Sequence, residues 1–220
     1  MKAVVFVDVQ KDFIDGALRN ERAIEVTPKI VEFAKKCAAD PDCKLYATRD
    51  THQKTKYNKR VETKIDDVTD PVRIVDVPVT GYLASLEGKR LPVEHCIELT
   101  DGWMLNDKLM EVLDGKCTFV NKPTFGSFDL AEIIYEDDIA AVNKHNYLQG
   151  ALHCHKKTLL DEIVLCGFCT DICCISCGLL LRAKFPNTKI TIMKDLCAGT
   201  TKENHEAALK VMQSCQIDIA

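Results

Sequence analysis

Short apolar runs alternate with longer amphipathic segments along most of the chain. The first run, Lys2 to Asp8, is continuous and β-branched, as expected for a strand that is buried on both faces. The segment from Ala23 to Cys37 instead repeats its apolar positions at helical spacing. Further strands are predicted at 44–48, 117–122, 162–167 and 189–194, and further helices at 105–113, 130–135, 172–185 and 202–215.

This alternation of strands and helices predicts an α/β domain. Parallel strands joined by helical crossovers place helices on both faces of a mostly parallel sheet. We therefore expect a three-layer αβα architecture of the Rossmann-like kind. A chain of 220 residues with 46% apolar content suits one domain spanning residues 1–220.

Residues 54–81 interrupt the pattern. The segment is charged and lacks helical periodicity, although 72–77 is compatible with a short edge strand or a hairpin. Irregular insertions of this length are often lids or interface elements. We interpret the segment as an insertion near the functional edge of the sheet.

Composition narrows the possible partners and the compartment. A net charge of -4 without a basic stripe disfavours nucleic acid. No apolar run reaches the roughly 18 residues of a membrane helix, and the N-terminal run is too short for a signal peptide. Twelve cysteines without a secretion signal favour free thiols in a reducing, cytoplasmic environment. Most of them, including Cys37, Cys117, Cys166 and Cys177, have the apolar context of small core residues.

Polar residues mark the carboxyl ends of four predicted strands. Asp8 and Lys122 end the strands that carry them, Asp50 follows the second strand, and Cys173 lies just beyond the fourth. Ligands bind at this edge of a parallel sheet, so we expect these four side chains to converge there.

The segment 169–174 is a predicted strand-to-helix turn. Thr170 or Asp171 is a plausible N-cap, which would place Cys173 in the first helical turn. Unpaired N–H groups and the helix dipole favour an anion at that position. We therefore expect the Cys173 thiol to be biased toward thiolate, the nucleophilic form.

Five motifs, in order and on the expected elements, resemble the isochorismatase-like cysteine hydrolases, and within them the nicotinamidase-type amidases. The resemblance covers nearly the whole chain apart from the insertion. The motifs are VDVQKDF at 7–13, TRDTH at 48–52, PVEHC at 92–96, KPTFGSF at 122–128 and GFCTDIC at 167–173.

The resemblance implies a catalytic triad of Asp8, Lys122 and Cys173. Asp8 would act as general base toward Cys173 and then as general acid toward departing ammonia, while Lys122 would orient Asp8. The backbone N–H groups of Cys169 and Cys173 would form the oxyanion hole. The family geometry also implies a cis peptide bond between Phe168 and Cys169.

A metal site is the second implication. Asp50 and His52 are two residues apart at a strand end, so both side chains point to one face. With His95 they would form a three-ligand set, commonly for zinc, that binds the pyridine nitrogen of nicotinamide in the family. The alternative is that Asp50 caps a turn while the histidines are ordinary loop residues. The family-like context of His95 favours the metal.

The pocket walls depart from the nicotinamidase pattern. Nicotinamidases commonly carry an indole in the loop of the third ligand, whereas residues 91–95 here read LPVEH. Phe13 and Phe125 remain as expected aromatic walls of a substrate pocket. The single tryptophan, Trp103, is expected to pack against a helix start.

Other cysteines and histidines suggest weaker sites. Cys166, Cys169, Cys174 and Cys177 are too closely spaced in sequence, and point in too many directions, for a structural zinc site. Residues 153–155 (HCH) are a possible ligand cluster, but a solvated surface explains them better. Cys174 points about 100° away from its neighbour on a helix and is expected to serve packing.

The expected function is hydrolysis of nicotinamide, or of a related small carboxamide, through a Cys173 thioester, with a role in NAD salvage. The resemblance implies a homo-oligomer that binds a small-molecule amide. Three alternatives remain: a metal-independent isochorismatase-type hydrolase acting on a vinyl ether, a ureido or carbamoyl hydrolase, and a catalytically silent binding module.

Overall fold

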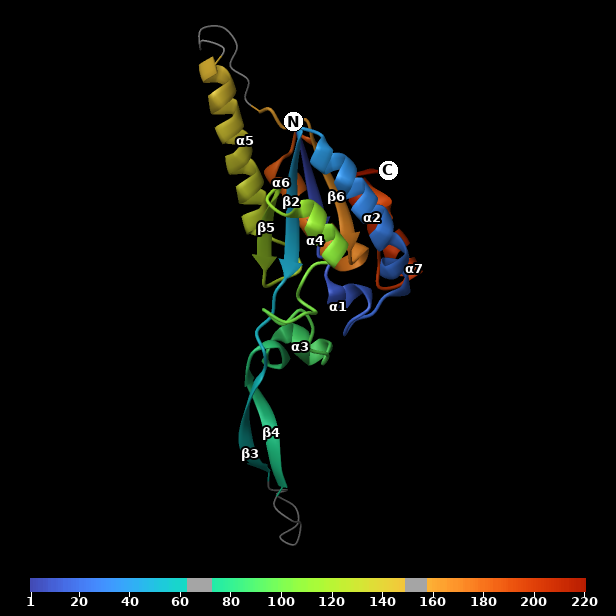
Figure 1. The fold of residues 1–220 in the computed structure, drawn as a ribbon. Helices are drawn as coiled ribbons and strands as arrows, with labels where there is room; N and C mark the ends of the chain where they lie inside the picture. Colours follow the sequence, from blue (N-terminus) through green and yellow to red (C-terminus); the bar gives the residue numbers. More distant parts are fainter. Residues whose placement is uncertain (63–72, 149–157) are drawn as a thin grey trace.

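Six parallel strands form the central sheet of the computed structural model, which describes residues 1–62, 73–148 and 158–220 (Figure 1). The strands are β1 (Lys2–Val7), β2 (Cys43–Asp50), β5 (Cys117–Lys122), β6 (Glu162–Phe168), β7 (Lys189–Ala198) and β8 (Asp218–Ile219). Their order is β5-β2-β1-β6-β7-β8, and every neighbouring pair is parallel. The predicted parallel sheet is therefore confirmed.

Helices cover both faces of this sheet. The main ones are α2 (Glu21–Ala39), α4 (Asp107–Leu113), α5 (Phe128–Leu148), α6 (Ile175–Lys184) and α7 (Lys202–Ser214). Helices α2 and α4 lie together on one face, and α5 and α6 lie on the other (Figure 1). No helix among the described residues is both long and apolar enough to cross a membrane.

The core forms where the apolar pattern predicts it. Strand β1 is central, and its residues from Ala3 to Val7 have no exposed surface, which explains their unbroken apolar run. Helix α2 buries a stripe at helical spacing that includes Val26, Ile30 and Ala34. It begins where the Asn20 side chain accepts hydrogen bonds from two backbone N–H groups of the first turn.

Helix α5 is much longer than the predicted segment 130–135. The residues of α5 beyond 135 include acidic side chains, and Asp137 among them has partners in the structure. Asp137 accepts a hydrogen bond from the Tyr46 hydroxyl at 2.8 Å and pairs with Lys44 at 2.7 Å, so it ties α5 to β2. Tertiary contacts therefore extend the helix beyond its apolar stripe.

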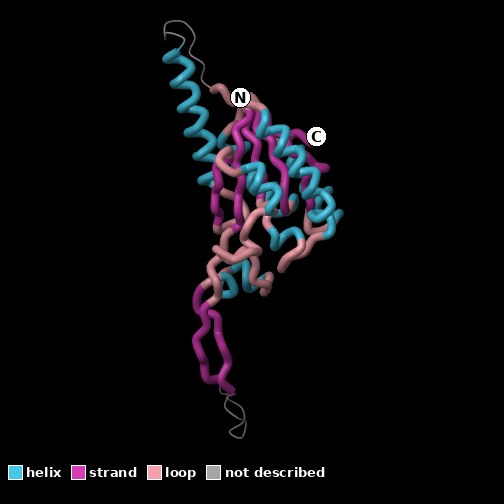
Figure 2. The backbone as a smooth tube through the Cα atoms, in the orientation of Figure 1, coloured by secondary structure: helices cyan, strands magenta, loops and turns pink. Residues whose placement is uncertain are grey.

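The insertion forms an antiparallel hairpin of β3 (Lys56–Glu62) and β4 (Arg73–Thr80). The hairpin projects from the carboxyl-end edge of the sheet and stands apart from the main domain (Figure 2). A short turn, η1 (Tyr82–Ala84), and helix α3 (Leu86–Arg90) return the chain to the domain. The predicted strand around 72–77 is confirmed over its described residues, within β4.

Candidate active site

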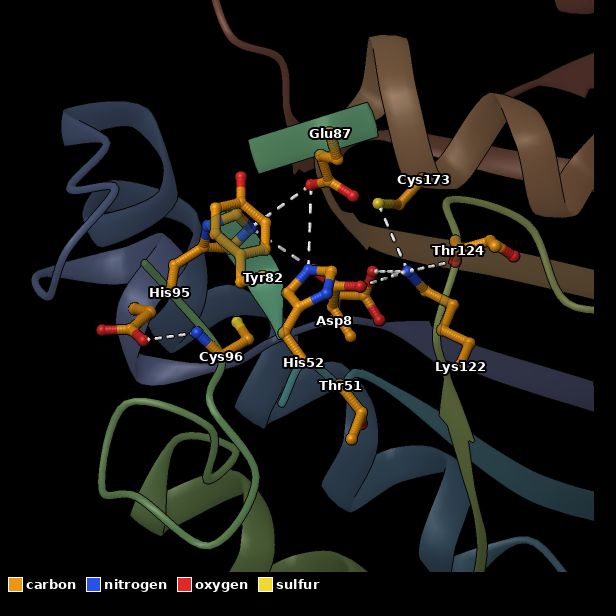
Figure 3. Close-up of polar contacts among 12 residues, drawn as sticks. Asp8, Thr51, His52, Tyr82, Glu87, His95, Cys96, Lys122, Thr124 and Cys173 are labelled. Atoms are coloured by element: carbon orange, nitrogen blue, oxygen red, sulfur yellow. Dashed lines mark hydrogen bonds and ion pairs between the residues drawn. The ribbon is translucent and has the colours of Figure 1, made fainter. Parts of the chain in front are cut away.

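The carboxyl ends of the central strands bring the predicted polar residues together (Figure 3). Asp8 follows β1, Asp50 and Lys122 are paired at the ends of β2 and β5, and Cys173 lies in η2 (Thr170–Cys174), the turn after β6. The predicted convergence at this edge is confirmed. Asp8, Lys122 and Asp50 are almost completely buried, so their charges must be satisfied by one another.

Lys122 connects the members of this group. Its ammonium nitrogen, Nζ, lies 2.7 Å from Asp8 Oδ2 and donates a hydrogen bond to Cys173 Sγ at 3.4 Å (Figure 3). It also lies 3.5 Å from Asp50 Oδ1 and donates to the Thr124 carbonyl at 3.2 Å. One buried cation therefore contacts both the candidate base and the candidate nucleophile.

Burial and charge set the protonation of these groups. Burial raises the pKa of Asp8, and the nearby ammonium of Lys122 offsets this only in part. Burial alone would lower the pKa of Lys122, but the charges of Asp8, Cys173 and Asp50 hold it well above its usual value. Lys122 is thus a permanent cation, and Asp8 is a stronger base than an exposed aspartate.

The expectation of a resting Cys173 thiolate is wrong. Burial raises the pKa of this thiol well above its usual value, and the Lys122 ammonium opposes that effect without overcoming it. The N-cap prediction also fails, because Cys169, not Thr170 or Asp171, is the N-cap residue of this π-type turn, and no side chain caps it. Cys173 therefore needs a base before it can attack.

The backbone before this turn lies close to the backbone of β1. Gly167 has φ of +125°, and a Cβ there would collide with the Val7 carbonyl oxygen. The Phe168–Cys169 peptide bond is cis, as the resemblance implies. The backbone N–H groups of Cys169 and Cys173 remain the predicted oxyanion donors of this turn.

Hydrogen bonds join the turn that carries Cys173 to the C-terminal part of the chain. The Thr170 hydroxyl lies 2.9 Å from His205 Nδ1, and Asp171 accepts a hydrogen bond from the Thr200 backbone N–H at 2.8 Å. Cys174 is fully buried beside Cys197, which agrees with its predicted packing role.

Asp8 is positioned by a residue that sequence reasoning missed. The Thr48 hydroxyl, fully buried on β2, donates to Asp8 Oδ1 at 2.7 Å and accepts from the Asp8 N–H at 3.2 Å. Thr48 opens the TRDTH motif, but nothing in the motif indicates a contact with Asp8, so only the structure identifies it.

The predicted metal ligands form a compact cluster with one further member. Ligand atoms of Asp50, His52, Glu87 and His95 all lie within 4.8 Å of one another. Asp50 Oδ2 is 2.9 Å from His52 Nε2 and 3.5 Å from His95 Nε2, and Glu87 Oε1 is 3.7 and 3.6 Å from the same two nitrogens (Figure 3). Glu87 lies on α3, directly after the inserted hairpin, and no motif marked it.

The donor set fits a divalent cation. His95 Nδ1 lies 2.9 Å from the Val93 carbonyl oxygen and can donate to it, which leaves Nε2 with a free lone pair facing the cluster. Burial and the Asp50 charge raise the pKa of Glu87, a cost that a cation would relieve. Two carboxylates and two imidazoles at this spacing suit zinc.

The loop that carries His95 is held against the N-terminal part of the chain. Asp12 Oδ2 accepts a hydrogen bond from the Cys96 N–H at 2.7 Å, and the Phe13 ring meets the His95 ring edge-on at 5.6 Å. The Tyr82 ring packs against both histidine rings at 4.7 and 4.9 Å. These contacts fix the imidazoles before any ligand binds.

In a comparison with known protein families, the isochorismatase domain model matches residues 2–220 of the chain. The chain belongs to the isochorismatase family. No curated protein matches it significantly. Among similar solved structures is a nicotinamidase/pyrazinamidase from Bacillus subtilis, with 21% identity, a TM-score of 0.66 and coverage of 100% of this chain and 98% of that one. The pyrazinamidase of Pyrococcus horikoshii in complex with zinc has 20% identity, a TM-score of 0.66 and coverage of 100% and 98%. The yeast nicotinamidase bound to the inhibitor nicotinaldehyde has 18% identity, a TM-score of 0.62 and coverage of 100% and 99%. At these identities the likeness shows a shared fold.

In this member of the isochorismatase family, an open cavity of about 1200 Å³ connects the thiol to the ligand cluster. Cys173 and Cys169 line one part of it, and Asp50, His52, Glu87 and His95 line another. The predicted walls Phe13 and Phe125 also line it. None of the described residues in the segment 54–81 lines it, whereas Leu86, Glu87 and Arg90 of α3 do.

Trp103 does not line the cavity. Its carbonyl accepts a hydrogen bond at 2.8 Å from Gln10, the N-cap residue of α1 (Lys11–Ile14), which agrees with its predicted place at a helix start. Its indole N–H donates to the Thr51 hydroxyl at 2.9 Å, and the Arg49 guanidinium stacks over the ring at 4.1 Å. The indole therefore packs against the end of β2, because a buried Trp N–H needs an acceptor and Thr51 supplies one.

The alternative cysteine site is absent from the described residues. Their only group of three or more potential ligands is the Asp50 cluster, which excludes Cys166, Cys169, Cys174 and Cys177. None of the described cysteines forms a disulfide. The sequence 153–155 lies outside the described residues.

Proposed function

We propose that this isochorismatase-family hydrolase cleaves small carboxamides such as nicotinamide to the acid and ammonia. The observation that carries the proposal is Lys122, whose ammonium contacts both Asp8 and Cys173 inside a cavity shared with the His52–His95 cluster. A nucleophile, a base and a charge-balancing group in contact are what acyl transfer requires.

The chain's own residues account for the chemistry. Asp8 accepts the thiol proton of Cys173 as the sulfur bonds to the amide carbon. The oxyanion accepts hydrogen bonds from the backbone N–H groups of Cys169 and Cys173. Asp8 then returns the proton to the departing nitrogen, so ammonia leaves and a thioester remains. Water, deprotonated by Asp8, adds to the thioester, and the acid leaves as the thiol is restored.

Asp50, His52, Glu87 and His95 would hold the metal. A bound zinc ion would act as a Lewis acid toward a donor atom of the substrate, as it does toward the pyridine nitrogen in the nicotinamidases that the sequence resembles. The task of these four residues is therefore to place the substrate against Cys173.

The ligand cluster also separates this proposal from vinyl ether hydrolysis. Family members with that activity lack the metal set, whereas here four potential ligands share one cavity with the thiol. We therefore favour the amidase over the isochorismatase-type reaction.

Ammonia release from nicotinamide tests the proposal. We expect turnover by the zinc-loaded protein, loss of activity in Cys173→Ala, and retention of activity in Cys174→Ala, because Cys174 is buried beside Cys197 outside the cavity. A chelator should reduce the activity, and added zinc should restore it. Undiminished ammonia release by Cys173→Ala would refute the proposal.

A further inference from the structure

The cavity is much larger than the proposed small substrate requires. At about 1200 Å³ it exceeds the roughly 300–1,000 Å³ of pockets that enclose drug-sized ligands. A single pyridine ring bound between Cys173 and the ligand cluster would leave most of this volume filled with water.

Apolar side chains also line the cavity, and several of them are exposed. Leu86 on α3 is 82% exposed, Phe125 after β5 is 43% exposed, and Leu91 after α3 is 38% exposed, although each lines the cavity. Leu18, before α2, is partly buried and lines it too. We call Leu18, Leu86, Leu91 and Phe125 the apolar collar. Exposed leucines are common singly, but several around one opening indicate a binding surface.

The cavity lining combines reactive polar groups with the apolar collar. Cys173, Cys169 and the four potential ligands supply its reactive polar groups, and the collar comes from three separate loops or short elements. No tryptophan narrows the space, because Trp103 packs against β2. A bound amide would place its carbonyl at Cys173 and direct the rest of its acyl group along the collar.

We propose that the preferred substrates are primary carboxamides with an extended apolar acyl group, an alkyl chain or an arylalkyl group, larger than a single ring. This inference rests on the proposed amidase function and names the substrate class of the same site. Each methylene that reaches the collar is removed from water, and this should raise kcat/KM about two- to fourfold.

A chain-length series tests the inference. The wild-type, zinc-loaded protein is assayed for ammonia release with butanamide, hexanamide, octanamide, 4-phenylbutanamide and nicotinamide. We expect kcat/KM to rise by at least tenfold from butanamide to octanamide, and 4-phenylbutanamide to exceed nicotinamide. A flat or falling series, with nicotinamide turned over best, would overturn the inference while leaving the amidase proposal intact. No turnover of any of the amides would instead refute the amidase proposal itself.

A matched pair of leucine variants locates the effect. Leu86→Ser removes apolar area from the collar, whereas Leu99→Ser changes a leucine of almost equal exposure, 84%, that does not line the cavity. We expect Leu86→Ser to lower the octanamide to butanamide ratio of kcat/KM about fivefold or more and Leu99→Ser to leave it unchanged. Equal ratios in the two variants would overturn the assignment of the collar.

Sedimentation of both variants separates substrate binding from contact with a second copy of the chain. We expect Leu86→Ser and wild type to show the same oligomeric state. Dissociation of Leu86→Ser with an unchanged chain-length series would overturn the inference, because the collar would then serve assembly.

Discussion

The two halves of the candidate site are built differently. The half with Asp8, Lys122 and Cys173 lies at the carboxyl ends of β1, β5 and β6, and one buried ammonium contacts both of the other groups. The residues of the other half, His52, Glu87 and His95, are carried by loops and by the short helix α3 that follows the hairpin. In the proposed function, the first half carries out the chemistry and the second positions the substrate.

Asp50 belongs to both halves. Its Oδ2 faces the two histidines, and its Oδ1 lies 3.5 Å from Lys122 Nζ. Hydrogen bonds from His52 and His95 outweigh burial and hold the pKa of this carboxyl below its usual range. The Asp50 carboxylate therefore connects the two halves electrostatically. A mutation should still be able to abolish the function of one half without abolishing that of the other.

The largest effect is expected from Asp8→Asn. The amide is nearly isosteric but cannot accept the Cys173 proton, so kcat should fall about 10⁴-fold, as when a base or its partner is removed from other nucleophilic triads. Zinc content, measured by elemental analysis, should stay at the wild-type value. Asp15→Asn, an exposed aspartate outside the cavity, is the control. Retention of wild-type kcat in Asp8→Asn would contradict the role of Asp8.

The converse effect is expected from Glu87→Gln. Loss of one charged ligand should weaken zinc binding about 10- to 100-fold and raise KM, with a smaller change in kcat at saturating zinc. Competition with a chromogenic chelator measures the zinc affinity, and Glu111→Gln on the exposed side of α4 is the control. An unchanged zinc affinity would show that Glu87 is not a metal ligand.

This difference between the halves also explains what the sequence could predict. Asp8, Asp50, Lys122 and Cys173 were predictable because parallel strand ends meet at one edge, and each followed an apolar run. Glu87 and Leu86 were not, because the path of a hairpin insertion leaves no periodic signal. The raised pKa of Cys173 was missed because burial by distant segments outweighs the local helix terminus. The length of α5 was missed for a similar reason, since Asp137 finds partners on β2.

A moderate effect is expected from Thr48→Val, which tests how Asp8 is held. The variant keeps the shape of the side chain but removes the hydroxyl donor at 2.7 Å from Asp8 Oδ1. We expect kcat to fall about 10-fold. Thr118→Val on β5, which lacks this contact, should leave kcat unchanged. Equal kcat values in the two variants would show that Thr48 does not position the base.

The pH profile of kcat/KM gives a second readout of the same contact. Asp8 must be ionised to accept a proton, so activity should decline as the pH falls through its pKa, which burial raises above the ordinary aspartate value. Removing the Thr48 hydroxyl disfavours the carboxylate further, so the acidic limb of Thr48→Val should shift to higher pH. A shift to lower pH would contradict this account.

The smallest effect is expected at the opposite end of the sheet, and it serves as a control for both halves. Glu162 pairs with Lys2 at 2.9 Å and Lys189 at 3.1 Å, and these partners outweigh burial and lower its pKa to about 2. Because the folded pKa is depressed, the stabilisation is present above about pH 4.5 and is lost as the pH falls toward 2. Glu162→Gln should cost about 1 kcal/mol at pH 7 after solvent screening.

Urea denaturation of wild type and Glu162→Gln at pH 7 and pH 3 measures this difference. The difference in the free energy of unfolding between the two proteins should be smaller at pH 3 than at pH 7, while kcat and zinc content at pH 7 stay at wild-type values. A stability difference that is larger at pH 3 than at pH 7 would contradict a lowered pKa of Glu162 in the folded protein.

The most direct test of the account is to trap the acyl group. Wild-type protein turning over a carboxamide is quenched in acid, digested and mapped by mass spectrometry. The account predicts the acyl mass on the peptide that contains Cys173, carried by that sulfur, and no such adduct in Asp8→Asn. Steady ammonia release with the acyl mass on another residue, or with no adduct at any quench time, would contradict it.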